Sequence, residues 1–554
     1  LVKLFSGKKI NCNAMELRRS INAGEDVSPV GDSHGELPFE EVRATLTKMQ
    51  FTDKALLDSE LVGGNASKTY VALVGLFAAL GGFLFGLDLG YISGVESMAS
   101  FSEDMLHGEE MRSITTGTVT GIFALGAIVA AFPAVISCIV DHLGRQGCMI
   151  LGGATFCVGA AMQGGAYSLN AMLCGRMIAG FAVGLLSANV PLYQSEIAPP
   201  EQRGAIVSLY QLAITMGIMV AFWANFWLRP LEHGWRYSIL LQLIPGGLFA
   251  AGALFMPQSP RWLVSRRRYK SALETLKRIR GKDEDVRIEL VECYREYRRE
   301  RSTGKPNYVE FLTGNSGKVL LIGIGLQLLQ QLCGLNVFMY YGPTVFKKIF
   351  HTQGASFLFA ALSGLVNFLS TFPALCLVDR IGRTTLLLSS AIGMMICCGT
   401  LAAVGEACFS STSSDECGPI SKYAMAGAVF LDIFNYAYGW GPVVWIYCSE
   451  IFSLKYKTKA IGVTTGANWV GNFLIGFTPP WLMEKIGFKT FWIFAAVNLL
   501  GAVVSCMLPE TKGKSLEEIQ LLFHTWLHGE DVSGDLFLCN GEGYISDESD
   551  SDES

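Results

Sequence analysis

The most informative segment of the chain reads Gln327-Leu-Leu-Gln330-Gln331-Leu-Cys-Gly334-Leu-Asn336-Val-Phe-Met-Tyr340-Tyr341. It lies inside an apolar segment that is long enough to cross a membrane. Amide side chains that faced lipid would lose their hydrogen bonds to water, so we expect them to face a neighbouring helix, a cavity or a polar ligand. Uncharged amides beside tyrosines suit a neutral ligand that is rich in hydroxyl groups, such as a sugar.

The composition indicates a helical protein that crosses a membrane many times. Of the 554 residues, 51% are hydrophobic and 16% are charged, whereas a soluble domain usually carries about a quarter charged residues. The charged residues gather at the ends and in the middle of the chain. The net charge of −5 is spread over a membrane-embedded body and therefore says little about binding partners.

Twelve apolar segments follow one another along the chain, each of about 20 residues, the length that spans the hydrocarbon core. The sequence therefore predicts an all-α membrane protein with twelve transmembrane helices. The predicted spans are 70–95, 115–139, 148–166, 170–193, 205–228, 236–256, 317–341, 354–378, 385–405, 423–448, 460–481 and 488–508.

The segments outside the spans define the expected domains and orientation. The expected domains are a polar N-terminal segment (1–68), a first six-helix bundle (69–256), a basic helical loop (257–316), a second six-helix bundle (317–508) and an acidic tail (509–554). Positively charged loops stay on the cytosolic side, so we expect the basic loop and both termini there.

Two helices are expected within the basic loop, at Tyr269–Arg280 and Val286–Arg299, with Leu273, Leu276 and Ile279 along one apolar edge. Nucleic acid would be another partner for so many basic residues, but the flanking membrane spans already explain them. The loop between the first two spans is acidic instead, as an outside loop can be. Its acidic residues are Glu96, Glu103, Asp104, Glu109 and Glu110.

The two halves of the chain repeat one another. Asp141-His-Leu-Gly144-Arg145 recurs as Asp379-Arg-Ile-Gly382-Arg383, and Ser195-Glu196-Ile197 recurs as Ser449-Glu450-Ile451. Two six-span halves with internal symmetry are typical of transporters, whose substrate site lies between the halves near the middle of the membrane.

Six motifs resemble those of the sugar porter family of the major facilitator superfamily, both in their order along the chain and in their spacing, over about residues 70 to 513. The resemblance implies the major facilitator fold and a hexose transporter, with glucose as the expected sugar, that works by alternating access. Two runs within these motifs, Gln-Gln-Leu-Cys-Gly and Trp-Ile-Tyr-Cys-Ser-Glu-Ile-Phe, are most similar to those of fungal high-affinity glucose symporters. The motifs are Gln330-Gln331-Leu-Cys-Gly334-Leu-Asn336, Gly441-Pro442-Val-Val-Trp445-Ile-Tyr-Cys-Ser449-Glu450-Ile451-Phe452, Asp379-Arg380-Ile-Gly382-Arg383, Ser195-Glu196, Pro257-Gln-Ser-Pro260-Arg261 and Pro509-Glu510-Thr-Lys-Gly513.

The resemblance implies a sugar site made of amides and tryptophans. In the family, the residues that match Gln330, Gln331 and Asn336 hydrogen-bond the sugar hydroxyls. Amides supply both donors and acceptors, and aromatic faces pack against the C–H side of a pyranose. An alternative is that these amides only hold helices together. The other sugar ligands that the resemblance implies are Gln211, Asn367, Trp445, Asn468 and Trp469.

The helix that carries the amides is expected to be broken. In a straight helix Asn336 would lie well over 100° around the axis from both Gln330 and Gln331. If all three amides face one ligand, the helix has to bend or unwind near Gly334, as the discontinuous helices of transporters do.

Asp88 is the candidate for coupling transport to an ion. Gly86-Leu87-Asp88 in the first span matches Gly334-Leu335-Asn336 in the seventh. An ionisable acid at that depth is costly and is typically a proton site, and Arg176 of the fourth span is its expected partner. The resemblance implies proton symport, because proton symporters of the family carry Asp here and animal facilitative carriers carry Asn. The alternative is a structural Asp–Arg pair in a uniporter.

Residues at the inner helix ends are expected to form a cytosolic gate, whose salt bridges break as the two halves rock. The alternative is that these charges only set the orientation. Gln258 stands where the family often has Glu, and Lys455 and Lys457 stand where it often has Arg, so the latch of the second half is expected to be looser. The expected gate residues are Asp141, Gly144, Arg145, Glu196, Arg203, Asp379, Arg380, Gly382, Arg383 and Glu450.

An outer gate is implied at Tyr340 and Tyr341, which by resemblance close over bound sugar; tyrosines of the membrane interface are the alternative. Cys408 and Cys417 flank a polar loop, where a disulfide would form only if that loop lies outside.

The sequence contains no catalytic constellation, no phosphate-binding loop and no metal-ligand spacing. We therefore expect neither an enzyme nor a bound cofactor or metal, and we expect the proton gradient to drive transport. The expected partners are a small-molecule sugar and the lipid bilayer, for a chain that functions as a monomer in the plasma membrane. The alternatives left open are a facilitative uniporter, a porter of pentoses or cyclic polyols, and a sugar sensor that does not transport.

Overall fold

A computed structural model describes most of the chain and divides it into two units, residues 1–59 and 60–554. In the first unit it describes the helix α2 (Phe39–Lys48). All other helices discussed below belong to the second unit. The described residues are 39–49, 68–106, 111–199, 203–280, 286–302, 314–409, 418–452, 457–514 and 516–528.

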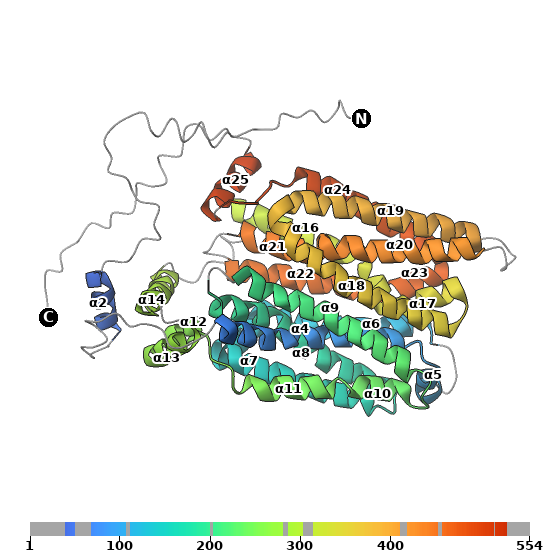
Figure 1. Ribbon diagram of the computed structural model, residues 1–554, viewed down its shortest axis with the longest axis horizontal. Helices are drawn as coiled ribbons and strands as arrows, with labels where there is room; N and C mark the ends of the chain where they lie inside the picture. Colours follow the sequence, from blue (N-terminus) through green and yellow to red (C-terminus); the bar gives the residue numbers. More distant parts are fainter. Residues whose placement is uncertain are drawn as a thin grey trace. The chain divides into compact units, whose positions relative to one another are not determined.

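The second unit is built from helices, and the described residues contain no strand. Each of the predicted spans lies on one helix or on an adjoining pair of helices (Figure 1). The helices are α4 (Lys68–Val95), α5 (Ala99–Leu106), α6 (Ser113–Ala131), α7 (Pro133–Gly164), α8 (Leu169–Ile197), α9 (Arg203–Leu228), α10 (Gly234–Leu240), α11 (Leu243–Ala253), α12 (Pro260–Ser265), α13 (Tyr269–Ile279), α14 (Val286–Ser302), α16 (Gly314–Leu332), α17 (Leu335–Phe350), α18 (Gln353–Ile381), α19 (Arg383–Phe409), α20 (Pro419–Tyr438), α21 (Trp440–Ile451), α22 (Lys457–Phe477), α23 (Pro479–Lys485), the 3-10 helix η2 (Gly487–Lys489), α24 (Thr490–Met507) and α25 (Leu516–His528).

Within the described residues, nine segments are long and apolar enough to cross a membrane. The predicted spans 236–256, 423–448 and 460–481 are not among them. Each of these three spans is also interrupted in the structure. The interruptions separate α10 from α11, α20 from α21 and α22 from α23. Broken helices at membrane depth are tolerated where they are buried in protein or line a cavity.

The second and third predicted spans differ from straight helices. The second span bends where α6 ends and Pro133 begins α7, because proline donates no backbone hydrogen bond. It then continues as far as Gly144, whose φ of 74° and ψ of 177° separate it from the third span. The helix therefore extends beyond residue 139, the predicted end of the second span.

The helices of each half pack mainly on one another. In the first half α4 packs on α9, α7 on α8 and α11, and α6 on α8; in the second half α19 packs on α20 and α24, α17 on α18, and α16 on α22. Figure 1 shows the two groups side by side, blue to green and yellow to red. The contacts of α6 with α22, α9 with α18 and α4 with α17 join them.

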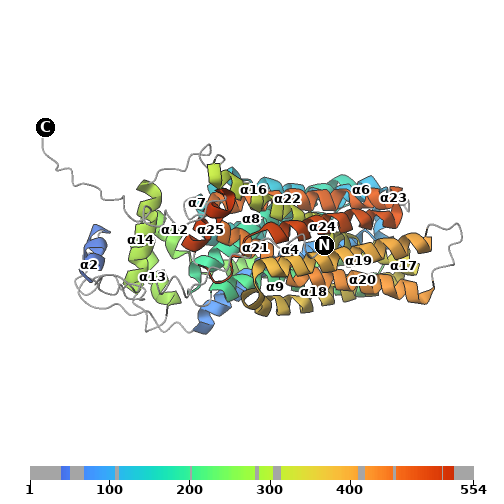
Figure 2. The same ribbon diagram turned by 90° about the horizontal axis from the view of Figure 1, so that it is seen from above.

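The helices predicted in the basic loop are confirmed as α13 and α14. Leu273, Leu276 and Ile279 are buried, as predicted for their apolar edge. Both views place α12, α13 and α14 beyond one end of the long helices (Figure 2). At the other end, Cys408 is disulfide-bonded. Cys417 lies outside the described residues, so the pairing of the two cysteines stays a prediction.

Candidate functional site

The predicted helix break at Gly334 is confirmed. The helix α16 ends at Leu332, α17 begins at Leu335, and Gly334 between them has a φ of 100° and a ψ of −3°. This left-handed conformation is available to glycine at little cost. The break allows Asn336 to reach back towards α16, where its Nδ2 donates to Gln331 Oε1 at 2.5 Å.

A cluster of amide side chains forms around this break. Asn468 of α22 is at its centre, because its Nδ2 donates to Gln327 Oε1 and to Gln330 Oε1, both at 2.6 Å. Its Oδ1 accepts from Gln331 Nε2 at 3.0 Å. We call the amide cluster the set Gln327, Gln330, Gln331, Asn336, Asn468 and Asn472.

The two predicted gate tyrosines continue the cluster along α17. Tyr340 donates its hydroxyl to Asn472 Oδ1 at 2.7 Å, and Asn472 Nδ2 donates to Gln331 Oε1 at 3.3 Å. Tyr341 donates to the carbonyl of Gly476. Both tyrosines are buried and hydrogen-bond to α22.

Two members of the amide cluster were missed as site residues in the sequence. Gln327 and Asn472 are buried, and each is bonded to a predicted site residue. Helical spacing could have found them, because residues three or four apart share one face of a helix. Gln327 precedes Gln330 by three residues, and Asn472 follows Asn468 by four.

The remaining predicted sugar ligands lie on other helices. Asn367 of α18 is buried, and its Nδ2 lies 3.8 Å from the sulfur of Met339. Gln211 of α9 and Trp445 of α21 are half-buried. Among the described residues no hydrogen bond joins these three side chains to the amide cluster.

Trp469, next to Asn468, connects the second half to the first. Its ring lies 5.1 Å from that of Phe85 and 6.3 Å from that of Phe123, centroid to centroid. Its Nε1 donates to Ser187 Oγ at 3.4 Å. Phe123 in turn faces the Arg176 guanidinium, 5.2 Å from its ring centroid. A line of contacts therefore runs from the amide cluster to Arg176.

Arg176 and Asp88 form a buried ion pair inside the first half. Arg176 Nη1 lies 3.2 Å from Asp88 Oδ2, and both side chains are 1% exposed. Arg176 Nε donates to the carbonyl of Val119 at 2.6 Å. Asp88 Oδ1 and Arg176 Nη2 are buried without a hydrogen-bond partner in the described part of the chain. The pair is thus only partly satisfied, which is costly for buried charges.

At the end of the bundles that carries α12, the first half contains a bidentate ion pair. Arg145 Nε and Nη2 donate to the two carboxylate oxygens of Glu196, at 2.9 and 2.8 Å. Tyr193 donates to the carbonyl of Pro257 at 2.8 Å. Arg280 donates to the carbonyl of Ile197 at 2.8 Å, which ties the basic helices to the end of α8.

The second half repeats this arrangement. Arg383 Nη2 donates to Glu450 Oε1 at 2.9 Å, and Tyr447 donates to the carbonyl of Pro509 at 2.8 Å. Thr511 adds a hydrogen bond to the other oxygen of Glu450 at 2.6 Å. Each of the two Arg–Glu pairs joins helices of the same half, so each stabilises the end of its own bundle.

Gly144 and Gly382 mark equivalent turns, with φ of 74° and 110°. Beside Gly144, Gln258 Oε1 accepts from the backbone N–H of Gln146 at 3.1 Å. Beside Gly382, Glu510 accepts from the backbone N–H groups of Arg383 and Thr384, at 2.9 and 3.0 Å. An amide in one half therefore replaces the carboxylate of the other.

Glu510 is held in its charged form. Burial alone would raise its pKa, but the hydrogen bonds from Thr384, Arg383 and Lys512 outweigh burial, and the pKa lies below its ordinary value. Of the other predicted gate residues, Asp141 and Arg380 are exposed. The structure does not describe the side chains of Arg203 and Asp379, nor any part of Lys455.

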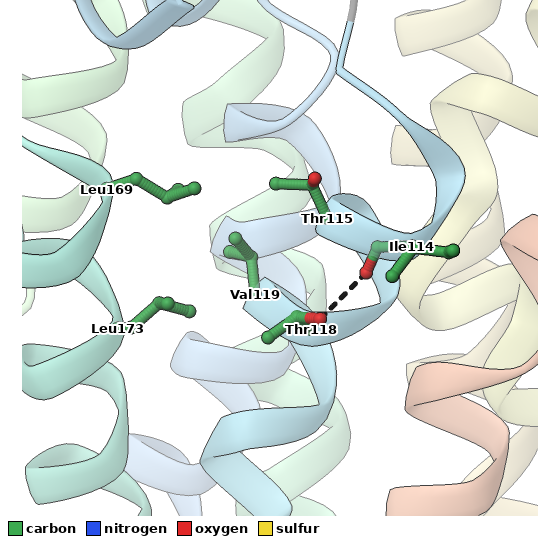
Figure 3. A pocket seen from close by; sticks show the side chains of 6 residues that line it. All are labelled: Ile114, Thr115, Thr118, Val119, Leu169 and Leu173. Carbon is green, nitrogen blue, oxygen red and sulfur yellow. Dashed lines mark hydrogen bonds between the residues drawn. The ribbon is translucent and has the colours of Figure 1, made fainter.

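A pocket of about 150 Å³ lies between α6 and α8, away from the amide cluster. Figure 3 shows that its lining is mainly aliphatic and that Thr118 donates its hydroxyl to the carbonyl of Ile114, at 2.8 Å. No predicted sugar ligand lines this pocket. Its lining residues are Ile114, Thr115, Thr118, Val119, Leu169 and Leu173.

Comparison with known proteins agrees with this arrangement. The family model described as sugar (and other) transporter matches residues 74–523. The chain is 34% identical over 487 residues to the probable glucose transporter rco-3 of Neurospora crassa, covering 82% of this chain and 80% of that protein. It is 33% identical over 460 residues to the galactose-proton symporter of Escherichia coli, covering 82% and 95%. Among solved structures it resembles the proton:xylose symporter XylE of the major facilitator superfamily, with a TM-score of 0.69, 27% identity and coverage of 82% and 99%.

Proposed function

Because this chain belongs to the sugar porter family of the major facilitator superfamily, we propose that it imports a hexose together with a proton. Glucose is the sugar we expect, and alternating access between the two halves is the mechanism. The chain performs no chemical conversion in this proposal. A glucose transporter and a proton symporter among its relatives support both parts of it.

The sugar site in this proposal is the amide cluster. Its side chains are neutral, buried and rich in both donors and acceptors, which suits hydroxyl groups that need both. The amides now bond to one another, so a sugar would exchange amide–amide hydrogen bonds for amide–hydroxyl bonds. Gln331 and Asn336 are well placed for this exchange, since they face each other across the helix break at Gly334.

One observation carries the coupling of sugar to a proton: Trp469 contacts Phe123, and Phe123 contacts Arg176. A sugar that shifts Trp469 would change the position of the Arg176 guanidinium relative to Asp88. Asp88 would bind a proton when the guanidinium moves away and release it when the pair reforms. Sugar and proton would then bias the same equilibrium between two conformations, which is the physical requirement for coupling.

The orientation and location are also proposals. We place α12, α13, α14 and both termini in the cytosol, because the basic residues of this segment follow the preference for positive charge on that side. The plasma membrane is the proposed location, with one chain as the functional unit.

The test of the proposed function compares the wild type with Asp88→Asn in sealed vesicles. The wild type should accumulate labelled glucose above equilibrium, and glucose addition should make the outer medium more alkaline. Asp88→Asn should lose both effects and keep the exchange of labelled for unlabelled sugar. Glu103→Gln, which removes an exposed acid of α5, should behave like the wild type.

Two results would contradict this proposal. Accumulation that survives in Asp88→Asn would show that the proton is carried elsewhere. A wild type that equilibrates glucose without moving protons would favour the uniporter. A panel of unlabelled competitors, including xylose, galactose and inositol, would show which hydroxyl arrangement the site accepts.

A further inference from the structure

Glu96 is a second acid in the first half, and the proposed function does not use it. It directly follows α4, and its backbone N–H still donates to Ile92 at 3.0 Å. The opposite end of α4 lies near the cytosolic end of α8, since Gln194 donates to the carbonyl of Gly75 at 2.9 Å. Figure 1 likewise shows α5, which follows Glu96, at the end of the bundle away from α13. Glu96 is therefore on the outer side of Asp88.

The carboxyl group of Glu96 points into the protein. Its Oε1 accepts from Thr120 Oγ1 of α6 at 2.9 Å. Its Oε2 is buried and has no hydrogen-bond partner in the described part of the chain. The residue as a whole is half-buried, whereas Asp88 is 1% exposed. Glu96 thus lies between the outer surface and the buried ion pair.

Arg176 connects the two acids electrostatically. Its positive charge acts on the carboxyl groups of both Asp88 and Glu96. From α17, Tyr341 also interacts with Glu96, and Tyr340 with Asp88. The groups that face Glu96 are therefore the guanidinium of Arg176, the hydroxyl of Thr120 on α6 and the phenol of Tyr341. Asp88 lies on α4, the helix that Glu96 directly follows.

Several buried polar atoms in this region have no hydrogen-bond partner in the described part of the chain, as a proton path through water needs. They include Glu96 Oε2, Arg176 Nη2 and Asp88 Oδ1. Eight residues separate the two acids, which is about 12 Å along a helix, too far for direct transfer between carboxyl groups. Buried polar atoms of this kind are commonly bridged by ordered water, which also conducts protons.

We propose that Glu96 is a proton relay that loads Asp88 from the outside. Its Oε2 takes a proton from water of the outer medium, and Glu96 becomes neutral. The proton then passes through water to Asp88 Oδ1, so that Asp88 becomes neutral and Glu96 returns to the carboxylate. This inference rests on the proposed symport and adds a residue to its proton path.

The acidity of Glu96 suits this role. Burial raises its pKa to about 8, although the charge of Arg176 and the hydrogen bond from Thr120 lower it. A relay exchanges protons fastest when its pKa lies near the working pH. Glu96 would hold a proton at acidic and neutral outer pH and lose it as the pH rises through that value.

The experiment compares Glu96→Gln with the wild type across a series of outer pH values. Glutamine keeps the oxygen that accepts from Thr120 but cannot relay a proton. The initial rate of glucose-coupled proton uptake should fall by about tenfold or more at neutral and alkaline pH, given what positioned acids contribute to proton transfer. Exchange of labelled for unlabelled sugar and the final accumulation level should stay as in the wild type. Glu103→Gln, which removes the same charge from the exposed face of α5, should change neither the rate of proton uptake nor the exchange of sugar.

Three results would overturn the relay. Proton uptake at the wild-type rate in Glu96→Gln, while Asp88→Asn loses accumulation, would show that protons reach Asp88 without Glu96. An equal loss of sugar exchange in Glu96→Gln and Thr120→Val would show a structural role at the contact with α6. A wild type without sugar-coupled proton uptake would first overturn the symport itself, and the relay with it.

Discussion

Gln330 donates its side-chain amide to the backbone carbonyl of Trp440 at 2.9 Å. A second hydrogen bond, to Gly441, measures 2.8 Å. Trp440 begins α21 directly after the break at Gly439, and Gln330 lies four residues before the break at Gly334. One side chain therefore ties together the two broken helices of the second half.

This contact predicts different roles for the two neighbouring glutamines. In Gln330→Ala, backbone carbonyls that cannot reorient lose their donor, and a lost buried hydrogen bond costs about 1–3 kcal/mol. Gln331 bonds to amide side chains, which can turn towards new partners. Gln330→Ala should lower the thermal unfolding temperature and raise the half-saturating glucose concentration severalfold. Gln331→Ala should raise that concentration with a smaller loss of stability. Equal unfolding temperatures for the two variants would contradict this division.

The break at Gly334 predicts that no larger residue fits there. A methyl group on Gly334 would lie 2.7 Å from a ring carbon of Phe494, in a backbone with a φ of 100°. Left-handed backbone costs other residues about 1–2 kcal/mol, and Phe494 would have to move as well. Gly334→Ala should therefore abolish uptake in vesicles at matched protein content. Gly325→Ala, on α16 with no atom within 4 Å of the added methyl, should transport normally. Normal uptake by Gly334→Ala would show that the break is not needed.

Trp469 is predicted to link sugar binding to proton uptake. Removing its ring in Trp469→Ala breaks the contacts with Phe85 and Phe123 and so separates the amide cluster from Arg176. Sugar exchange should persist with a raised half-saturating concentration, and the number of protons taken up per sugar should fall. Simultaneous recording of labelled sugar and outer pH measures that ratio. Trp492→Ala on the exposed face of α24 is the matched control. A wild-type proton ratio in Trp469→Ala would exclude this route.

Local patterns predicted the parts of the site that depend on one helix. The turn at Gly334 followed from the angular spacing of three amides, and the apolar edge of α13 followed from helical periodicity. The pairing of Asp88 with Arg176 required only two buried opposite charges at a similar depth. In each of these three cases, the residues that determine the local structure can be identified from their spacing or chemistry in the sequence.

Other features depend on contacts between helices that the sequence does not show. The break at Gly439 occurs where a methyl group would lie 2.2 Å from the Cβ of Ser390, on the neighbouring α19. The position of Trp469 against Phe123 depends on how α22 packs on α6. Such close approaches arise only in the packed bundle, which is why the interrupted span 423–448 was predicted as a continuous helix.

Glu510 is predicted to make the stability of the second half depend on pH. Its carboxylate accepts from two backbone N–H groups and from Thr384 Oγ1 at 2.7 Å. Because its pKa is lowered in the folded protein, the folded state favours the charged form. That stabilisation is complete above the ordinary carboxyl pKa and is lost as the pH falls through the lowered value.

Glu510→Gln tests this directly, because its single amide oxygen cannot replace both carboxylate oxygens and its NH₂ group would face backbone donors. At neutral pH the variant should unfold at a lower temperature than the wild type, with a loss of about 1–3 kcal/mol for the donors left unpaired. At acidic pH the two unfolding temperatures should converge, since the wild-type carboxyl is then protonated as well. Gln258→Glu is the reciprocal control, because the equivalent turn at Gly144 in the first half already uses an amide. This substitution should make the unfolding temperature depend on pH through the turn at Gly144. A difference between Glu510→Gln and the wild type that stays constant across pH would mean that the charge of Glu510 does not stabilise the turn at Gly382.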